Sequence, residues 1–85
     1  MRYQGWKNWE TWNIALWFGN DEGLYHEVKD HPRRFTAKSA KDFVLELLPA
    51  GTPDMKKLSA GELHSAYGRV GWGEIATSFN EMRGD

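Results

Sequence analysis

The stretch Asn8–Phe18, NWETWNIALWF, holds three of the five tryptophans of this 85-residue chain, and Trp6 lies just before it. A tryptophan buries on the order of 200 Å² and dominates the energetics of cores and interfaces. Asn8 is a good N-cap, because its side chain can accept a hydrogen bond from a free backbone N–H at the start of a helix. We therefore predict a first helix over Trp9–Phe18, ended by a left-handed Gly19.

Four further segments carry the capping residues or the apolar spacing of helices, and none shows the alternation of a strand. The predicted fold is all-α, a small single-domain bundle of four to five short helices around the Trp-rich first helix. The domain spans residues 1–85 with an ordered core of about residues 6–82, and the tail from Arg83 is expected to fray. The later helices are expected to start at Asn20 or Asp21 (stopping before Pro32), at Thr36 (ending at Pro49), at Thr52 (with a break near Ser59–Gly61) and after Gly71.

Helical periodicity predicts which face of the first helix points inward. At about 100° per residue, Ile14 and Phe18 fall on a different side from most of the tryptophans. Asn13 falls inside the tryptophan sector, where an amide without partners costs about 1–3 kcal/mol. We expect Asn13 to bond a backbone group or an indole N–H. The expected core members are Trp9, Trp12, Leu16, Trp17, Phe43, Leu47, Ile75 and Phe79.

Some of this aromatic surface can serve a partner instead, because Trp and Tyr are enriched at binding hot spots. Different rings can have different roles, so this hypothesis is compatible with a tryptophan core. The expected partner-binding surface combines Trp6 or Phe18 with the neighbouring residues Tyr3, Lys7 and Tyr25.

The sequence lacks the motifs that are typical of catalytic and metal-binding sites. The absence of cysteine excludes disulfides, thiolate metal sites and cysteine catalysis, and no phosphate-binding loop or nucleophile motif occurs. Glu10 and Glu74 lie in first helical turns, where carboxylates stabilise the helix. We expect no catalytic, metal or cofactor-binding residue; an enzyme would need polar groups that converge around Glu10, His26 or His64.

Charge and hydropathy set the remaining expectations. No apolar run approaches the roughly 20 residues that span a membrane, and the N-terminus lacks the apolar stretch of a signal peptide. We therefore expect a cytoplasmic protein without a membrane partner. The net charge is −1, but His26–Lys41 has five cations against two carboxylates. These cations could contact phosphates of a nucleic acid, and they are Lys29, Arg33, Arg34, Lys38 and Lys41.

Two motifs near opposite ends of the chain resemble those of a known family. The opening NWETWN, with LW and NDEGLY after it, is similar to N-[YW]-E-T-W-N, L-W and N-D-E-G-x-Y. Val70–Ala76, VGWGEIA, is similar to a closing V-N-W-x-E-I-A, although Gly71 replaces a residue able to cap the last helix. Both belong to a family of small uncharacterised proteins encoded largely by bacteriophages and bacteria.

The resemblance implies a small helical domain of phage or mobile-element origin, and it brings no established activity or functional residue. Combined with the missing catalytic signatures, it favours a non-catalytic accessory protein that binds a host protein or a second copy of itself. The alternative is a nucleic-acid-binding protein that uses the basic segment over residues 29–41.

Overall fold

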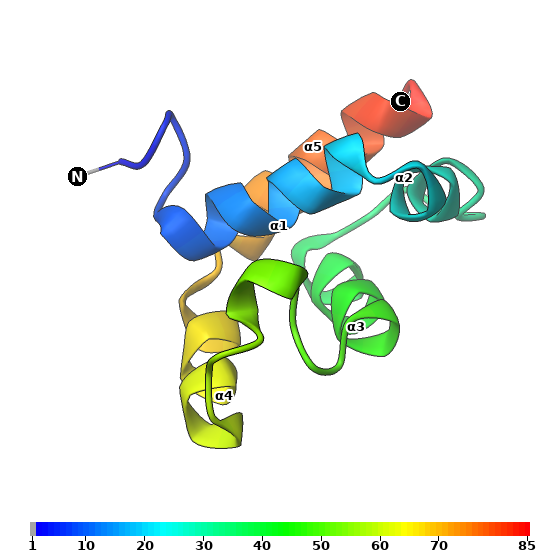
Figure 1. Cartoon of the computed structure of the whole chain (residues 1–85). Coiled ribbons are helices and arrows are strands. Elements are labelled where there is room, and N and C mark those ends of the chain that lie inside the picture. The colour runs from blue at the N-terminus through cyan, green and yellow to red at the C-terminus, as the bar shows by residue number, and fades with distance from the viewer. Residues whose placement is uncertain (1) are drawn as a thin grey trace.

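Five α-helices and one turn of 3-10 helix make up residues 2–85, the part of the chain that the computed structural model describes (Figure 1). Within these residues the extended structure is limited to one isolated bridge near the N-terminus. The predicted all-α class is therefore confirmed. The elements are α1 (Trp9–Asn20), α2 (Glu22–Lys29), α3 (Ala37–Leu47), η1 (Pro53–Met55), α4 (Ala60–Arg69) and α5 (Trp72–Arg83).

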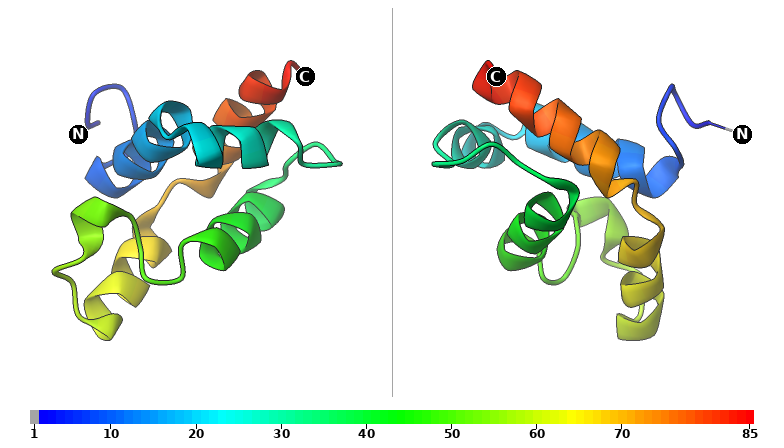
Figure 2. Two further views of the ribbon diagram at one scale, coloured as in Figure 1. Left: turned by 45° about the vertical axis from the view of Figure 1, so that its right-hand side comes forward. Right: turned by 180° about the vertical axis from the view of Figure 1, so that it is seen from behind.

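The first and last helices form the centre of the bundle. α1 and α5 lie side by side and run in the same general direction (Figures 1 and 2). α2 packs against both of them, α3 packs against α5, and α4 contacts α1. The N-terminal segment approaches the start of α5, so residues about 70 positions apart in the sequence become neighbours.

Capping side chains set most of the helix starts, as the sequence predicts. The side chains of Asn8, Asp21 and Thr36 accept hydrogen bonds from the first turns of α1, α2 and α3. Ser59 caps α4 in a reciprocal capping box, so the expected break near Ser59–Gly61 is confirmed. Gly71 gives α5 no side-chain cap, as its departure from the family motif implies.

The predicted end of the first helix is wrong. Gly19 lies inside α1, which continues to Asn20. Asp21 ends α1 instead, because its N–H donates to the Trp17 carbonyl (2.9 Å) while its side chain already accepts from the N–H of Leu24 in α2 (2.9 Å). One extended residue thus joins the two helices, and a glycine turn is not needed.

The last helix includes the first residue of the predicted tail. Arg83 is the last residue of α5, and Gly84 ends the helix in the left-handed conformation with a φ of 84°. The Arg83 guanidinium donates to the carbonyl of His31 (3.2 Å). This contact ties the end of α5 to the loop after α2.

The core is built on phenylalanines. Phe18 of α1 is fully buried, and its ring centroid lies 5.0 Å from Phe79 and 6.0 Å from Phe43. Phe35 joins the same cluster at 5.1 Å from both Phe43 and Phe79. Ile75 is fully buried and Leu47 packs against the core, so the expected core residues outside α1 are confirmed.

The predicted orientation of α1 is wrong for its core-facing residues except Trp9, which packs against the core as expected. Ile14 and Phe18 point inward and are fully buried. Trp12, Leu16 and Trp17 are only partly buried and lie outside the set of side chains packed against the core. Thr11 and Ala15 are buried as well, and the Thr11 hydroxyl accepts from the Gly71 N–H just before α5 (2.8 Å).

A group of polar side chains around Asn13 explains how α1 is rotated about its axis. Asn13 is fully buried, and its amide donates to Asp54 Oδ2 (2.7 Å) while its carbonyl accepts from the Thr52 hydroxyl (2.5 Å). The Trp17 indole N–H donates to the same Asp54 oxygen (2.8 Å). The expectation that Asn13 is hydrogen-bonded is confirmed, although its partners are side chains of the η1 segment. We call Asn13, Trp17, Thr52 and Asp54 the Asn13 junction.

Tyr67 attaches α4 to the rest of the bundle. Its hydroxyl donates to the Leu48 carbonyl (2.6 Å), and its own carbonyl accepts from the Trp72 indole (3.1 Å). Burial raises the pKa of the Tyr67 phenol above its ordinary value. The fifth tryptophan therefore has a structural role at the α4–α5 connection.

The reversed orientation of α1 makes a direct prediction about stability. Phe18→Ala is expected to cost about 3–5 kcal/mol, because it leaves a cavity in the aromatic core. Trp12→Ala is expected to cost only about 1–2 kcal/mol, since that ring is partly exposed. Urea unfolding followed by circular dichroism compares the two variants. A larger loss for Trp12→Ala than for Phe18→Ala would contradict the observed orientation.

The Asn13 junction makes the free energy of unfolding depend on pH in the acidic range. Hydrogen bonds from Asn13 and then Trp17 lower the pKa of Asp54 below its ordinary value of 3.8. The unfolded chain therefore binds more protons near that pH, so the stabilisation is present above the ordinary pKa and is lost as the pH falls through the lowered one. The Trp17 indole N–H resonance is expected to titrate with a midpoint below 3.8. A midpoint at or above that value, or no titration, would show that the junction does not form.

Candidate partner-binding groove

The N-terminal arm, residues 2–8, begins with a tight turn. Tyr3 and Trp6 exchange two backbone hydrogen bonds of 2.7 Å each. The residues between them, Gln4 and Gly5, have φ angles of 50° and 86°. Positive φ at both central positions is the signature of a type I′ turn, for which glycine is suited. The turn fixes the backbone that carries the Trp6 indole.

Glu74 of α5 fastens this arm to the bundle. Its carboxylate accepts from the Lys7 N–H (2.8 Å) and forms an ion pair with Arg2. Arg2 also donates to the Gly5 carbonyl (3.0 Å), and the Asn8 amide donates to the Arg69 carbonyl (2.7 Å). The arm is therefore held at the start of α5 and at the end of α4.

Both carboxylates expected in first helical turns make long-range contacts. Glu10 lies in the first turn of α1 and forms an ion pair with Arg69 (2.5 Å). Glu74 lies in the first turn of α5 and holds the arm. Each carboxylate thus connects two segments in addition to its favourable place in the helix dipole.

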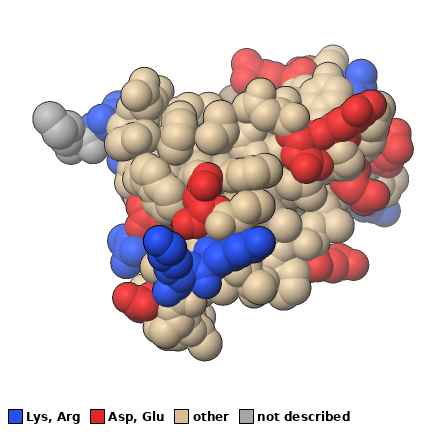
Figure 3. Space-filling model, in the orientation of Figure 1, with Lys and Arg blue, Asp and Glu red and all other residues tan. Residues whose placement is uncertain are grey.

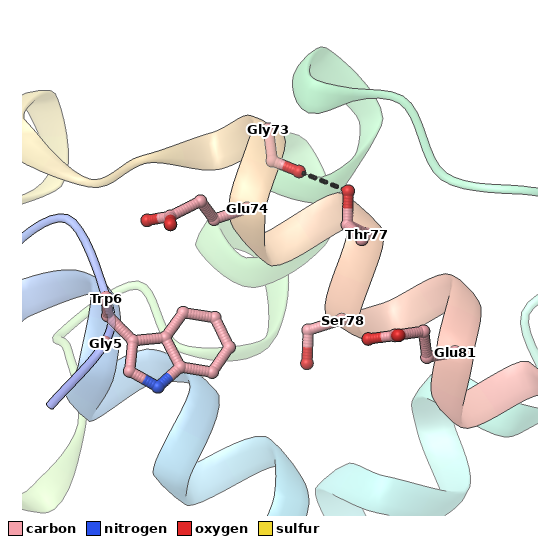
Figure 4. A pocket seen from close by; sticks show the side chains of 7 residues that line it. All are labelled: Gly5, Trp6, Gly73, Glu74, Thr77, Ser78 and Glu81. Carbon is pink, nitrogen blue, oxygen red and sulfur yellow. Dashed lines mark hydrogen bonds between the residues drawn. The ribbon is translucent and has the colours of Figure 1, made fainter.

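A groove of about 370 Å³ opens between the Trp6 indole and the exposed face of α5 (Figure 4). The α5 side presents small residues, Gly73, Thr77 and Ser78, which leave room beside the ring. The Thr77 hydroxyl donates to the Gly73 carbonyl (3.1 Å), and this bond turns it back toward its own helix. The full lining is Gly5, Trp6, Gly73, Glu74, Thr77, Ser78 and Glu81.

The charge of the groove is negative. Glu74 is already paired with Arg2. Within residues 2–85, Glu81 makes no side-chain hydrogen bond or ion pair, and in Figure 4 its carboxylate points into the space opposite Trp6. An indole face attracts cations, and a carboxylate across from it adds charge attraction. The arrangement suits a cationic group that lies against the ring.

Of the predicted partner-binding residues, Trp6 alone belongs to the lining of the groove. Trp6 lines the groove, while Tyr3 and Lys7 belong to the same arm. The Tyr3 side chain is 38% exposed, and its ring lies 5.1 Å from that of Trp12. The prediction for Phe18 is wrong, because that side chain is fully buried against Phe79.

Tyr25 lies elsewhere on the molecule. It belongs to α2, beyond the far end of the 12-residue α1, which measures about 18 Å from end to end. Its ring is partly buried, and the Lys29 ammonium lies 5.7 Å from the ring centroid. The structure therefore does not place Tyr25 beside Trp6.

The α5 side of the groove was not anticipated from the sequence. Gly73, Thr77 and Glu81 follow one another at intervals of four residues and so share a helix face. That spacing is a usable signal, although the apolar stripe of Ile75 and Phe79 is the stronger pattern in the same segment. The approach of the arm, which makes this face into a groove, has no local signature.

The five cations of the basic segment are all exposed, on α2, on α3 and in the loop between them. Lys38 pairs with Asp42 (3.0 Å). A hollow between α2 and α3 is lined by the carboxylates Glu27, Asp42 and Glu46, together with His31. Negative charge therefore alternates with the predicted phosphate-contacting residues, which are Lys29, Arg33, Arg34, Lys38 and Lys41.

The residues considered for enzyme chemistry lie on separate helices. Glu10 is on α1 and pairs with Arg69, His26 is on α2 beside Glu22 (3.8 Å), and His64 is on α4. None of the three lines the hollows described above. In residues 2–85 no group of three or more His, Cys, Asp or Glu side chains is arranged to hold a metal ion.

Fold and groove together define a small all-α domain with an aromatic, acidic groove at its N-terminal arm. The chain belongs to DUF7249, a family of unknown function, which it matches over residues 1–84. The resemblance to an uncharacterised family is to that extent confirmed. No curated protein and no solved structure matches the chain. Among the described residues, every helix is too short or too polar to cross a bilayer.

The role of Glu74 in holding the arm predicts a local opening. Glu74→Gln removes the charge that pairs with Arg2, and a hydrogen bond to a charged group is worth about 1.5–3 kcal/mol. Amide exchange at Trp6 and Lys7 is expected to accelerate by about tenfold or more. Glu81→Gln is the matched control, because Glu81 makes no contact with the arm. Equal exchange in the two variants would show that Glu74 does not fasten the arm.

Proposed function

We propose that this protein is a small accessory module that binds another protein through the groove between the N-terminal arm and α5. It acts by binding and catalyses no reaction of its own. The observation that carries the proposal is the Trp6 indole, held by a fixed turn beside small residues of α5 and facing the uncompensated carboxylate of Glu81.

The chemistry of the groove favours a basic segment of the partner. An Arg or Lys side chain would lie against the Trp6 ring, where a cation–π contact is worth about 0.5–2 kcal/mol. Its charge would face Glu81, and Gly73 and Ser78 leave room for the aliphatic part. The volume of about 370 Å³ lies at the small end for ligand pockets, which suits one long side chain rather than a folded surface.

The sequence motifs support a particular kind of partner. Proteins of phage and mobile elements commonly act on a component of the cell that harbours them, and the resemblance to such proteins supports a host protein in the cytoplasm as the partner. The missing catalytic signatures are expected for a protein that works by occupying a surface.

Short peptides of one sequence, with a central Arg, Lys or acetyl-lysine, test this proposal. The cationic peptides are expected to shift the NMR signals of the Trp6 indole and of the Gly73 and Ser78 amides, whereas acetyl-lysine leaves them unchanged. Glu81→Lys is expected to weaken binding by about tenfold, since a repulsive charge replaces an attractive one. Added salt weakens the remaining affinity.

The matched control is Glu46→Lys, which makes the same charge change on α3, outside the groove. Equal weakening by Glu46→Lys would mean that overall charge, and not the groove, controls binding. A single-stranded oligonucleotide that shifts Arg33 and Arg34 at about 50 mM salt, in a titration where the peptides shift nothing, would move the function to the basic segment.

A further inference from the structure

We infer that Arg2 is an intramolecular competitor for the groove: its guanidinium occupies one of two acidic positions there, and an arginine of the partner displaces it. The inference rests on the proposed function and deepens it, because it names arginine rather than lysine as the residue that the groove prefers. It also gives the N-terminal arm a regulatory role in addition to its structural one.

The two acidic positions are carboxylates on one face of α5. Glu74 and Glu81 are seven residues apart, which places them within about 20° around the helix and about 10 Å from each other along it. Both line the groove, and in Figure 4 their side chains lie on either side of Thr77 and Ser78. The groove therefore has a carboxylate toward each end.

The chain places one of its own guanidinium groups at the Glu74 end. Arg2 Nη2 pairs with Glu74 Oε2, and Arg2 Nε donates to the Gly5 carbonyl (3.0 Å). Gly5 and Glu74 both belong to the lining of the groove, one from the arm and the other from α5. A single guanidinium thus joins the two walls, and it shows which chemical group the residues at this end of the groove can bind.

This pair of contacts selects a guanidinium over an ammonium. The N–H groups of arginine form a planar fork that reaches two acceptors in a fixed geometry, whereas the lysine ammonium is a compact charge at the end of a flexible stem. Here the two acceptors are a carboxylate oxygen and a backbone carbonyl. A lysine of the partner is attracted by the charge alone, so arginine is the preferred ligand.

Both acceptors stay in position when Arg2 leaves. The Lys7 N–H still donates to Glu74 Oε1 (2.8 Å), and this bond holds the carboxylate against the arm. The backbone bonds that close the turn between Tyr3 and Trp6 do not involve Arg2. An arginine from another chain therefore finds a site that is already formed.

Arg2 is held weakly enough to be displaced. Its side chain is 58% exposed, whereas that of Glu74 is 32% exposed. Ion pairs at such exposure contribute little to stability, because water solvates both charges. A peptide that brings its own arginine replaces the same two contacts, and it also gains contacts with the Trp6 ring and with Glu81. Exchange of Arg2 for the partner is therefore favourable.

The test needs a control that is matched in charge. Acidic groups lie beside basic ones on the face shown in Figure 3, so the loss of any cation strengthens the general attraction for a cationic peptide. Arg2→Gln removes the competitor. Lys7→Gln removes the same charge from an exposed residue of the arm whose side chain does not line the groove.

Calorimetric titrations with the arginine and lysine peptides compare the two variants. Arg2→Gln is expected to bind the arginine peptide more tightly than Lys7→Gln does, by about threefold or more. The lysine peptide is expected to bind both variants equally, because it does not use the contacts that Arg2 vacates.

NMR follows the displacement directly. In the free chain, the Arg2 Nε–H is expected to exchange slowly with water, because it donates to the Gly5 carbonyl. Addition of the arginine peptide is expected to remove this protection, and the lysine peptide is expected to leave most of it in place.

Three results would overturn the inference and leave the proposed function standing. These are equal affinities of Arg2→Gln and Lys7→Gln for the arginine peptide, weaker binding by Arg2→Gln, and an Arg2 Nε–H that exchanges as fast in the free chain as in an unfolded peptide. Failure of every chain to bind either peptide would overturn the proposed function, and this inference with it.

Discussion

The buried amide of Asn13 is the constraint on which the arrangement of the bundle depends. An unpaired amide in the core costs about 1–3 kcal/mol, and Asn13 avoids this loss only when α1 turns it toward Thr52 and Asp54. Helical geometry then leaves no freedom of rotation. Phe18, about 140° from Asn13 around the helix, then points to the rings of Phe43 on α3 and Phe79 on α5, whereas Trp17, about 40° from Asn13, lies on the side that η1 covers.

Sequence reasoning succeeded where the causes are local. Asn8, Asp21 and Thr36 were recognised as caps because a cap acts within its own first turn. The rotation of α1 was missed because the partners of Asn13 lie about 40 residues away, and ring size alone favoured the tryptophans as core. The sequence identified only one side of the groove. Trp6 is recognisable as a binding residue by itself, whereas the α5 residues form a site only when the N-terminal arm lies beside them.

Phenylalanines fill the centre of the core, and the tryptophans lie at its edge or on the surface. Phe18 and Phe79 pack at 5.0 Å within a cluster of four rings, and Trp72 is used at the α4–α5 connection. Trp6 and Trp12 remain partly exposed on two neighbouring surfaces that meet at the turn of the arm. A small domain that keeps large aromatic rings at its surface is organised for recognition, which is the common basis of both proposals.

Contacts between aromatic protons, measured by NMR on selectively labelled protein, test the orientation of α1 most directly. The Phe18 ring is expected to show nuclear Overhauser contacts with the rings of Phe43 and Phe79, while the Trp12 indole shows them with Tyr3 and with no ring of α3 or α5. The opposite pattern, with Trp12 or Trp17 in contact with Phe43 and Phe79 and Phe18 in contact with neither, would contradict the account.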